Sequence, residues 1–366
     1  MRVETRFSVL GAGNGGQAMA AHLGVMGFPV TLYSGNSAKL SDIEQAGGLE
    51  LEGQIQGITR DVNLTGSPRV AAAFADVLMV VVPAFAHRDI ARILAPHLHE
   101  GHTVVLNPGR TLGAIEFDHT LRQHGCLAQV VVAEAQSLLY ACRVLAPGKI
   151  RVFSVKMSVP VAALPAWRTV EVARRLRRAF PQFVAASDLL ETGLDNIGAV
   201  FHPTPTILNL ARIEQDESFD YYHEGISPAV ARVLTRIDEE RLKVARALGV
   251  AARTAREWLA EVYGSSGRDL HEAIRNTRAY EGIRAPAEVN TRYILEDVPT
   301  GLVPISSLGE MVDVPTPTMD AVIELASAIT GQDFRASGRS LRNLGLDGMD
   351  VGDLHRFILE GREAVA

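Results

Sequence analysis

A glycine-rich segment near the N-terminus has the spacing of a turn that holds the phosphates of a dinucleotide. The G-x-G-x-x-G pattern falls on Gly11, Gly13 and Gly16. The apolar run 7–10 before it is typical of a strand, residues 17–26 after it are typical of a helix, and 29–33 indicate a second strand. In such a unit the glycines permit a tight turn, close approach of the backbone to the pyrophosphate, and close packing of helix on strand. The N–H groups at the start of the helix then face the phosphates. A glycine-rich turn in some other α/β protein is the alternative.

The end of the second strand bears on which nicotinamide cofactor this turn would accept. Enzymes that use NAD usually place Asp or Glu here, where it binds the ribose 2′-hydroxyl. Tyr33 is instead followed by residues 34–39, which include no acid. Neutral donors and one lysine stand in its place, so we expect NADP(H) to be favoured over NAD(H). The residues expected to bind the cofactor are Gly11, Gly13, Asn14, Gly15, Gly16, Ser34, Asn36, Lys39, Pro83 and Asn107.

His202 is the leading candidate for moving a proton. Hydride transfer from a nicotinamide needs little from the protein beyond placement and one proton source. His202 stands directly before Pro203, where a helix must stop. An unperturbed imidazole, with a pKa of about 6.5, can act as general acid and base near neutral pH. A surface or helix-capping histidine is the alternative. Around the turn at 97–102 we expect solvated loop histidines rather than a metal site, and no metal site is predicted elsewhere.

The segment 290–304 places an arginine close to acidic residues. Arg292 could grip a substrate carboxylate with its bidentate fork. Asp297 could orient an imidazole, as the third member of a catalytic triad does. From the residues alone, a charged pair on a helix surface is the favoured interpretation.

The first half of the chain alternates strands and helices in the order of a doubly wound parallel sheet. The apolar run 77–83 is typical of a strand covered on both faces. Other strands are expected at 48–53, 59–64, 103–109, 129–133 and 149–156, and helices at 85–98, 112–124 and 167–180. Ligands of such sheets lie beyond the carboxyl ends of the strands, where 107–109 and 134–137 fall. Plain turns are the alternative for both segments.

From about residue 188 the pattern becomes helical. The stretch 228–248 is amphipathic at helical spacing and stops at Gly249. Further helices are expected at 254–263, 270–275, 316–330 and 351–359, and no convincing strand is found. We therefore expect α/β plus all-α architecture: an N-terminal Rossmann domain over 1–186 and an all-helical substrate domain over 187–366. The cleft between them is the expected active site.

Composition narrows the class of protein. A chain of 366 residues with 47% apolar and 21% charged residues suits two globular domains. Its formal charge of -6 argues against a general nucleic-acid binder. Two cysteines, Cys126 and Cys142, form no disulfide framework and suit a reducing cytoplasm. The N-terminus lacks the pattern of a signal peptide, and the apolar runs are too short to span a bilayer, so we expect no membrane association.

The motifs together resemble those of the opine dehydrogenase family, which includes octopine and nopaline dehydrogenases and the bacterial N-(1-carboxyethyl)-norvaline dehydrogenase. The segments that carry the resemblance are 11–16, 106–109, 202–203, 221–226, 290–304 and 333–346. The resemblance implies that an amino acid or amine condenses with an α-keto acid to an imine, which NAD(P)H reduces to a secondary amine.

The family pattern also implies a role for particular residues. His202 would be the acid/base and Asp297 its partner, with the two side chains within hydrogen-bond reach. Arg292 would hold a substrate carboxylate, and Asn196 and Thr206 would also bind substrate. A homodimer is implied by family analogy alone.

Two other functions stay open from the sequence. A ketoacid reductase that resembles ketopantoate reductase has the same two-domain plan, but such enzymes usually rely on a lysine in the helical domain. Lys243 is the only lysine after Lys156, and it lies in no obvious motif. A regulator that binds NAD(P) without turnover is the alternative from another class. NAD(P)H oxidation separates the three, because a regulator gives none and a ketoacid reductase needs no amine.

Overall fold

The structure is a computed structural model that describes residues 5–362. It divides into two compact units: residues 5–192 with 355–362, and Gly193–Leu354. The boundary between the units therefore lies after Thr192, whereas the sequence predicted it after residue 186. Thr192 belongs to the first unit because its hydroxyl donates to Glu134 Oε1 at 2.8 Å. Residues 355–362 also belong to that unit, where Arg362 Nε donates to Asp118 Oδ2 at 2.8 Å.

The first unit is built on an eight-stranded sheet. Its strands are β1 (Phe7–Leu10), β2 (Val30–Tyr33), β5 (Val62–Thr65), β6 (Val77–Val80), β7 (Thr103–Leu106), β8 (Val131–Ala135), β11 (Val159–Leu164) and β12 (Phe183–Ala185). They are ordered β12-β11-β8-β7-β6-β1-β2-β5, and every neighbouring pair is parallel except β8 with β11. The order reverses direction beside β1. In doubly wound sheets, ligands bind at the carboxyl ends next to this reversal.

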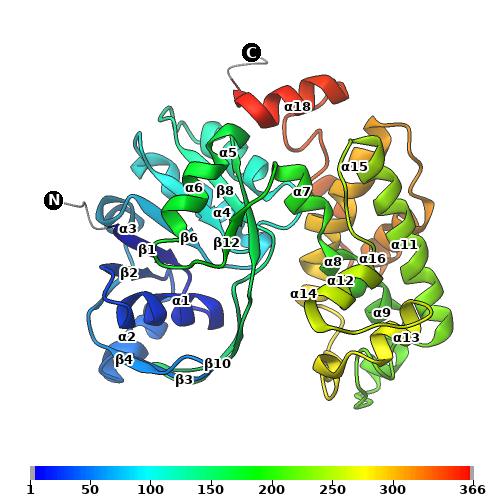
Figure 1. Cartoon of the computed structure of the whole chain (residues 1–366), viewed down its shortest axis with the longest axis horizontal. Helices are drawn as coiled ribbons and strands as arrows, with labels where there is room; N and C mark the ends of the chain where they lie inside the picture. Colours follow the sequence, from blue (N-terminus) through cyan, green and yellow to red (C-terminus); the bar gives the residue numbers. More distant parts are fainter. Residues whose placement is uncertain (1–4, 363–366) are drawn as a thin grey trace. The chain divides into compact units, whose positions relative to one another are not determined.

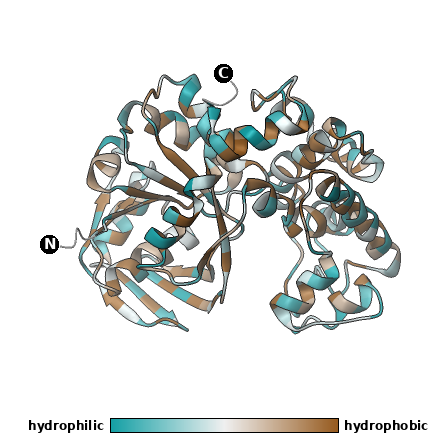
Figure 2. Cartoon of the chain, turned by 45° about the horizontal axis from the view of Figure 1, so that its top comes forward, coloured by the Kyte–Doolittle hydropathy of each residue, from teal (hydrophilic) through white to brown (hydrophobic). Residues whose placement is uncertain are grey.

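Helices accompany the strands of this sheet. They are α1 (Asn14–Val25), α2 (Ser37–Gln45), α3 (Pro68–Phe74), α4 (His87–Leu94), α5 (Gly113–Gln123), α6 (Thr169–Leu176) and α7 (Leu189–Leu194), with the short turns η1 (Ala84–Ala86), η2 (Ala95–His97) and η3 (Ala166–Arg168). Strands β1, β6 and β7 are buried along their whole length, and Figure 2 shows brown, hydrophobic stretches in the strands of this unit. This is the pattern expected of parallel strands covered on both faces. The predicted Rossmann architecture is confirmed.

A second, four-stranded sheet was not predicted. It contains β3 (Leu49–Gly53), β4 (Gly57–Thr59), β9 (Tyr140–Ala146) and β10 (Lys149–Val155), in the order β4-β3-β10-β9. Figure 1 shows β3, β4 and β10 at the lower edge of the unit, beside α1. The segment 149–156 was expected in the main sheet, but it forms a hairpin with β9 across Gly148, whose φ is +69°. Alternating exposure along β9 and β10, rather than continuous burial, marks them as strands with one solvated face.

The second unit is helical, as predicted. Its helices are α8 (Ile197–Phe201), α9 (Pro203–Leu208), α10 (Leu210–Glu214), α11 (Pro228–Ala247), α12 (Ala255–Tyr263), α13 (Leu270–Arg275), η4 (Arg278–Tyr280), α14 (Arg292–Leu295), η5 (Val298–Leu302), α15 (Val303–Met311), α16 (Pro317–Thr330) and α17 (Phe334–Ser337). The final helix, α18 (Val351–Glu360), crosses the division between the units. The strand-type pairing described here is one isolated bridge between Asp220 and Arg284. Within residues 5–362, no helix has both the length and the apolar character of a membrane span.

Candidate active site

The glycine-rich turn joins β1 to α1 with a geometry that only glycine permits at two positions. Gly11 has φ +118°, and a Cβ there would lie 2.5 Å from the carbonyl oxygen of Val81. A Cβ on Gly16 would lie 1.7 Å from the carbonyl oxygen of Gly11, so the helix packs directly on the turn. Gly13 differs, because a Cβ there would meet no atom within 4 Å. The turn is closed on the protein side and open at Gly13, which is where a pyrophosphate would approach.

Two further features fit a bound dinucleotide. No side chain caps the N-terminus of α1 at Gly13, so its first N–H groups suit an anion. Asn107, directly after β7, is 1% exposed; its Nδ2 donates to the carbonyl oxygen of Val105 at 2.8 Å. The Oδ1 atom of Asn107 is buried without a hydrogen-bond partner among residues 5–362, which suits a donor supplied by a ligand. Pro83 is exposed just after β6, at the start of η1. The residues present therefore fit NAD(P), which would supply a hydride when bound.

Asn14 uses its carboxamide oxygen within the protein, and its contact with the cofactor stays a prediction. Its Oδ1 accepts from the backbone N–H of Val144 at 2.9 Å. The carboxamide thus fastens β9 to the start of α1. Gly15, beside it, packs on Leu138: a Cβ at Gly15 would lie 2.9 Å from Leu138 Cδ2. The second sheet and the loop before it therefore cover one side of the turn.

The loop after β2 leaves hydrogen-bond donors available. Ser34 Oγ accepts from the backbone N–H of Asn36 at 3.1 Å, and Asn36 Oδ1 accepts from the N–H of Lys39 at 3.3 Å. Both side chains use their acceptors inside the loop, and the structure from residue 5 to 362 provides no acceptor for the Ser34 hydroxyl hydrogen or the Asn36 amide. Lys39 is exposed at the first turn of α2. These donors suit a ligand group that accepts hydrogen bonds.

In the second unit, His202 and Asp297 form a hydrogen bond across 95 positions of sequence. His202 Nδ1 lies 2.7 Å from Asp297 Oδ2. Asp297 is fully buried, and the side chain of His202 is 15% exposed. Because a carboxylate has no hydrogen to give, Nδ1 carries the proton and donates it, which leaves Nε2 to exchange a proton with a ligand. The predicted contact between these side chains is confirmed.

The position of His202 follows from the break between α8 and α9. Pro203 begins α9, so the chain changes direction at His202. The hydroxyl of Tyr221 donates to the carbonyl oxygen of His202 at 2.5 Å. The hydroxyl of Thr206 lies 2.8 Å from that carbonyl oxygen and 2.8 Å from the Tyr221 hydroxyl. Thr206, which was predicted to bind substrate, is fully buried, and its hydroxyl bonds to the backbone carbonyl of His202.

The remaining predicted substrate residues are Arg292, on α14, and Asn196, at the start of α8. Arg292 begins α14; its side chain is 62% exposed, with Nε 4.0 Å from Glu296 Oε2. Asn196 is buried at the start of α8, where its Nδ2 lies 3.1 Å from the place a Cβ on Gly301 would occupy. Arg292 is thus exposed, whereas Asn196 lies within the packing of α8 on η5.

Sequence reasoning missed two aromatic residues that surround His202. Tyr293 stacks on the imidazole, and Tyr221 packs against Tyr293 with ring centroids 5.0 Å apart. Burial raises the pKa of Tyr221 well above its usual range and also raises that of Tyr293, so both remain neutral phenols. The signal in the sequence was the Tyr directly after Arg292 and the Tyr-Tyr pair at 221–222, in segments already noted for the family resemblance.

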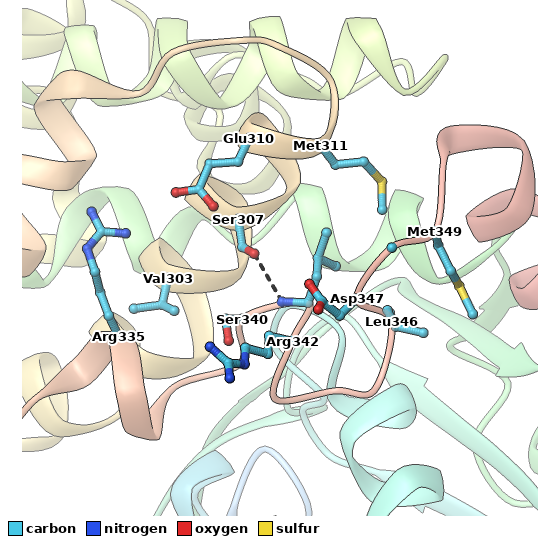
Figure 3. A pocket seen from close by; sticks show the side chains of 12 residues that line it. Val303, Ser307, Glu310, Met311, Arg335, Ser340, Arg342, Leu346, Asp347 and Met349 are labelled. Atoms are coloured by element: carbon cyan, nitrogen blue, oxygen red, sulfur yellow. Dashed lines mark hydrogen bonds between the residues drawn. The ribbon is translucent and has the colours of Figure 1, made fainter.

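The second unit also contains a pocket of about 430 Å³ beside α15 and α17. Figure 3 shows Glu310, Arg342 and Asp347 around it, and the hydroxyl of Ser307 accepts from the backbone N–H of Leu341 at 3.0 Å. Neither His202 nor Asp297 lines this pocket. Within the described part of the chain, no group of three or more His, Cys, Asp or Glu residues could hold a metal ion. His102, expected to be solvated, is instead buried, with Nε2 3.1 Å from the carbonyl oxygen of Ala72.

Comparison with known proteins settles the family. Over 353 residues the chain is 41% identical to an opine dehydrogenase from Arthrobacter sp. (strain 1C), with 96% of this chain and 98% of that protein covered. The chain belongs to the opine dehydrogenase family. Residues 185–330 match the family described as NAD/NADP octopine/nopaline dehydrogenase, alpha-helical domain, and residues 6–132 match the NAD-dependent glycerol-3-phosphate dehydrogenase N-terminus. The protein is therefore an NAD(P)-dependent oxidoreductase that acts on CH–NH bonds, by reductive condensation of an amine with an α-keto acid.

Solved structures share this fold. An octopine dehydrogenase with NADH and L-arginine has a TM-score of 0.82 at 22% identity, with 98% of both chains covered. A yersinopine dehydrogenase with NADP⁺ bound has a TM-score of 0.70 at 18% identity, with 99% of both chains covered. A ketopantoate reductase from Ralstonia eutropha JMP134 is more distant, with a TM-score of 0.62 at 19% identity, 89% of this chain and 99% of that one being covered.

Proposed function

We propose that His202 and Asp297 are the acid–base pair of this opine dehydrogenase. The observation that carries the proposal is the 2.7 Å contact between His202 Nδ1 and the buried Asp297 Oδ2. Formation of an imine from an amine and a keto acid expels water, and the leaving hydroxyl needs a proton. Nε2 of His202 supplies that proton and takes one up in the reverse oxidation. Asp297 fixes the tautomer that makes Nε2 the exchanging atom.

Arg292 is proposed to hold a substrate carboxylate. Its guanidinium is largely exposed, and α14 also carries Tyr293, which stacks on His202. A planar fork binds a carboxylate through two parallel hydrogen bonds and so fixes its orientation. Asn196 is proposed to act on the amine substrate, by family resemblance.

NADP(H) is proposed as the favoured cofactor, held by the turn residues Gly11 to Gly16 and by Pro83 and Asn107. The support comes from the loop after β2, where Ser34 and Asn36 keep their donors and Lys39 is exposed. A 2′-phosphate accepts hydrogen bonds and carries negative charge, so it suits this loop. Solved family members include one with NADH and one with NADP⁺, and both cofactors are therefore to be compared.

A cytoplasmic homodimer is the proposed form of the protein. Both cysteines, Cys126 and Cys142, are free, which suits a reducing compartment. The dimer rests on family analogy. Light scattering coupled to size-exclusion chromatography gives the mass directly, and a monomer would overturn this part of the proposal.

The function is tested by NADPH oxidation with a panel of keto acids and amines. Pyruvate and a longer keto acid are each offered alone and with each of a set of amino acids and amines. Oxidation that requires both partners, with a secondary amine found by mass spectrometry, supports the proposed reaction. Oxidation by keto acid alone indicates a ketoacid reductase, and binding of NADPH without oxidation indicates a regulator.

A further inference from the structure

The pocket of about 430 Å³ beside α15 and α17 is lined by unpaired charges of both signs. Glu310, Arg342 and Asp347 line it, and their side chains make no hydrogen bond or ion pair within the described residues 5–362. All three are exposed, so a ligand can reach them. Figure 3 shows Glu310 and Arg342 on opposite sides of the view. The volume lies within the range of about 300–1,000 Å³ that is usual for sites of small molecules.

The other charged side chain of the lining is already neutralised. Arg335 Nη2 donates to Asp320 Oδ1 at 2.8 Å, and its Nε donates to Glu324 Oε1 at 2.9 Å. The unpaired lining charges are therefore the two carboxylates of Glu310 and Asp347 and the one guanidinium of Arg342. An anion such as a keto acid or NADPH suits this set poorly, because the carboxylates outnumber the free cation.

Two serine hydroxyls add donors to the same lining. Ser307 Oγ accepts from the N–H of Leu341 at 3.0 Å, and Ser340 Oγ accepts from the N–H of Asn343 at 3.2 Å. The structure over residues 5–362 offers no acceptor for either hydroxyl hydrogen, so both can donate to a ligand carboxylate.

Apolar side chains complete the pocket. Leu346 is fully buried, and Met311 and Met349 are half-buried in the lining. Methionine is unbranched and adapts its shape, so these side chains can pack on the methylene groups of a ligand. The pocket thus combines polar groups for both ends of a small molecule with an apolar wall for its middle.

Hydrogen bonds within the protein hold the segment 338–349 that forms one side of the pocket. Asn343 Nδ2 donates to the carbonyl oxygens of Ala336 and Gly338, each at 2.8 Å. The N–H of Leu346 donates to the carbonyl oxygen of Leu341 at 2.9 Å. Sites for small molecules are largely formed before the ligand binds, and this segment has that character.

We propose that this pocket binds a basic amino acid. Its two cationic groups meet the carboxylates of Glu310 and Asp347, and its carboxylate meets the planar fork of Arg342. The chain of methylenes between them lies on Met311 and Met349. The inference goes beyond the proposed reaction, because neither His202 nor Asp297 lines the pocket.

Calorimetric titration of the whole wild-type protein with L-lysine tests the site. Two analogues each remove one charge: L-norleucine lacks the side-chain ammonium, and cadaverine lacks the carboxylate. L-Lysine should bind at least about tenfold more tightly than either analogue, because each lost charge removes a charge-assisted hydrogen bond. NADPH and keto acid are left out, so the result does not depend on whether the protein condenses the two proposed substrates. Norleucine that binds as tightly as lysine would contradict the role of the carboxylates.

Variants of the lining then locate the ligand. Glu310→Gln and Asp347→Asn should each weaken lysine binding by about tenfold or more. Arg342→Gln should weaken lysine to a similar extent but leave cadaverine unchanged, since cadaverine has no carboxylate. Glu214→Gln is the matched control, because Glu214 is exposed on α10 and lies outside the pocket. Circular dichroism checks the fold of each variant.

Binding of lysine as an amine substrate would give a different pattern. Arg292→Lys would then weaken lysine, and the three variants of the pocket would bind it as the wild type does. An affinity for lysine that is unchanged in all three pocket variants overturns the proposal, and so does the absence of saturable binding to the wild type.

Discussion

The phenol ring of Tyr293 stacks on the imidazole of His202, with ring centroids 4.4 Å apart and planes 18° from parallel. Asp297 meets the same imidazole at its Nδ1 edge. Tyr293 and Asp297 lie four residues apart, at α14 and just before η5. One short segment therefore fixes both the face and the edge of the ring, and Nε2 is the atom left for chemistry.

Replacement of Tyr293 by leucine should slow turnover by about 2- to 12-fold, because stacked aromatic pairs contribute about 0.5–1.5 kcal/mol. Tyr293→Phe keeps the ring and should remain within about twofold of the wild type. The measurement is kcat at saturating NADPH, keto acid and amine, with the fold of each variant checked by circular dichroism. Equal losses in the two variants would show that the hydroxyl, not the ring, matters.

His202→Ala should lose about 10²–10⁴-fold in turnover while it still binds NADPH, since positioned acid–base groups contribute about that factor. Asp297→Asn should also be slow, because the carboxylate that fixes the Nδ1 proton is lost. The double variant should be little slower than the slower single one, as the two side chains act as a unit. Single-turnover rates and NADPH titrations are measured for all three variants. If the loss of rate in the double variant equals the product of the two single losses, the two side chains do not act as a unit.

The sequence predicted the architecture well where patterns are local. Continuous apolar runs predicted the buried strands β1, β6 and β7, and helical spacing predicted α11 and α16. The small sheet escaped prediction because it depends on distant pairing. Strand β10 pairs with β3, from which it is separated by about 100 positions, and no local pattern encodes that choice.

The site was predicted unevenly for a similar reason. The contact between His202 and Asp297 was expected from the family resemblance, since spacing alone cannot bring residues together across 95 positions. The buried position of Thr206 could not be anticipated, because its surroundings come from Tyr221 on another segment.

Gly13 and Gly16 should respond differently to alanine. A Cβ on Gly16 would collide with the Gly11 carbonyl oxygen, so Gly16→Ala should lower the melting temperature and distort the turn. A Cβ on Gly13 meets no protein atom, and its backbone at φ -84° suits alanine. Gly13→Ala should therefore melt like the wild type yet bind NADPH at least about tenfold more weakly, because the methyl group occupies the approach of the pyrophosphate. Thermal melts and fluorescence titrations separate the two effects, and unchanged affinity in Gly13→Ala would place the pyrophosphate elsewhere.

Arg292→Lys should be a poor replacement if Arg292 grips a carboxylate. Lysine keeps the positive charge but loses the fork that fixes two oxygens. The loss should appear mainly as a raised KM for the keto acid, by about tenfold, with a smaller change in kcat. Arg284→Lys is a suitable control, because Arg284 is also exposed in the helical unit but pairs with Asp220 at 3.4 Å. An unchanged KM in a folded Arg292→Lys protein would point to a structural role.

Ser34→Asp should shift the cofactor preference from NADPH toward NADH. In the wild type, Ser34 accepts from the N–H of Asn36 and keeps its hydroxyl hydrogen for a ligand. An aspartate at this position can accept the same bond but presents a negative charge, which repels a 2′-phosphate and accepts from a ribose 2′-hydroxyl. The ratio of kcat/KM for NADPH to that for NADH should fall by about tenfold or more.

Lys39→Met should lower the same ratio by a smaller factor, since an exposed charge is screened. Ser34→Ala is the matched control: it removes the hydroxyl without adding charge and should weaken both cofactors slightly. If the wild-type kcat/KM for NADH is at least about tenfold higher than that for NADPH, the predicted preference for NADPH is wrong, regardless of the results for the variants.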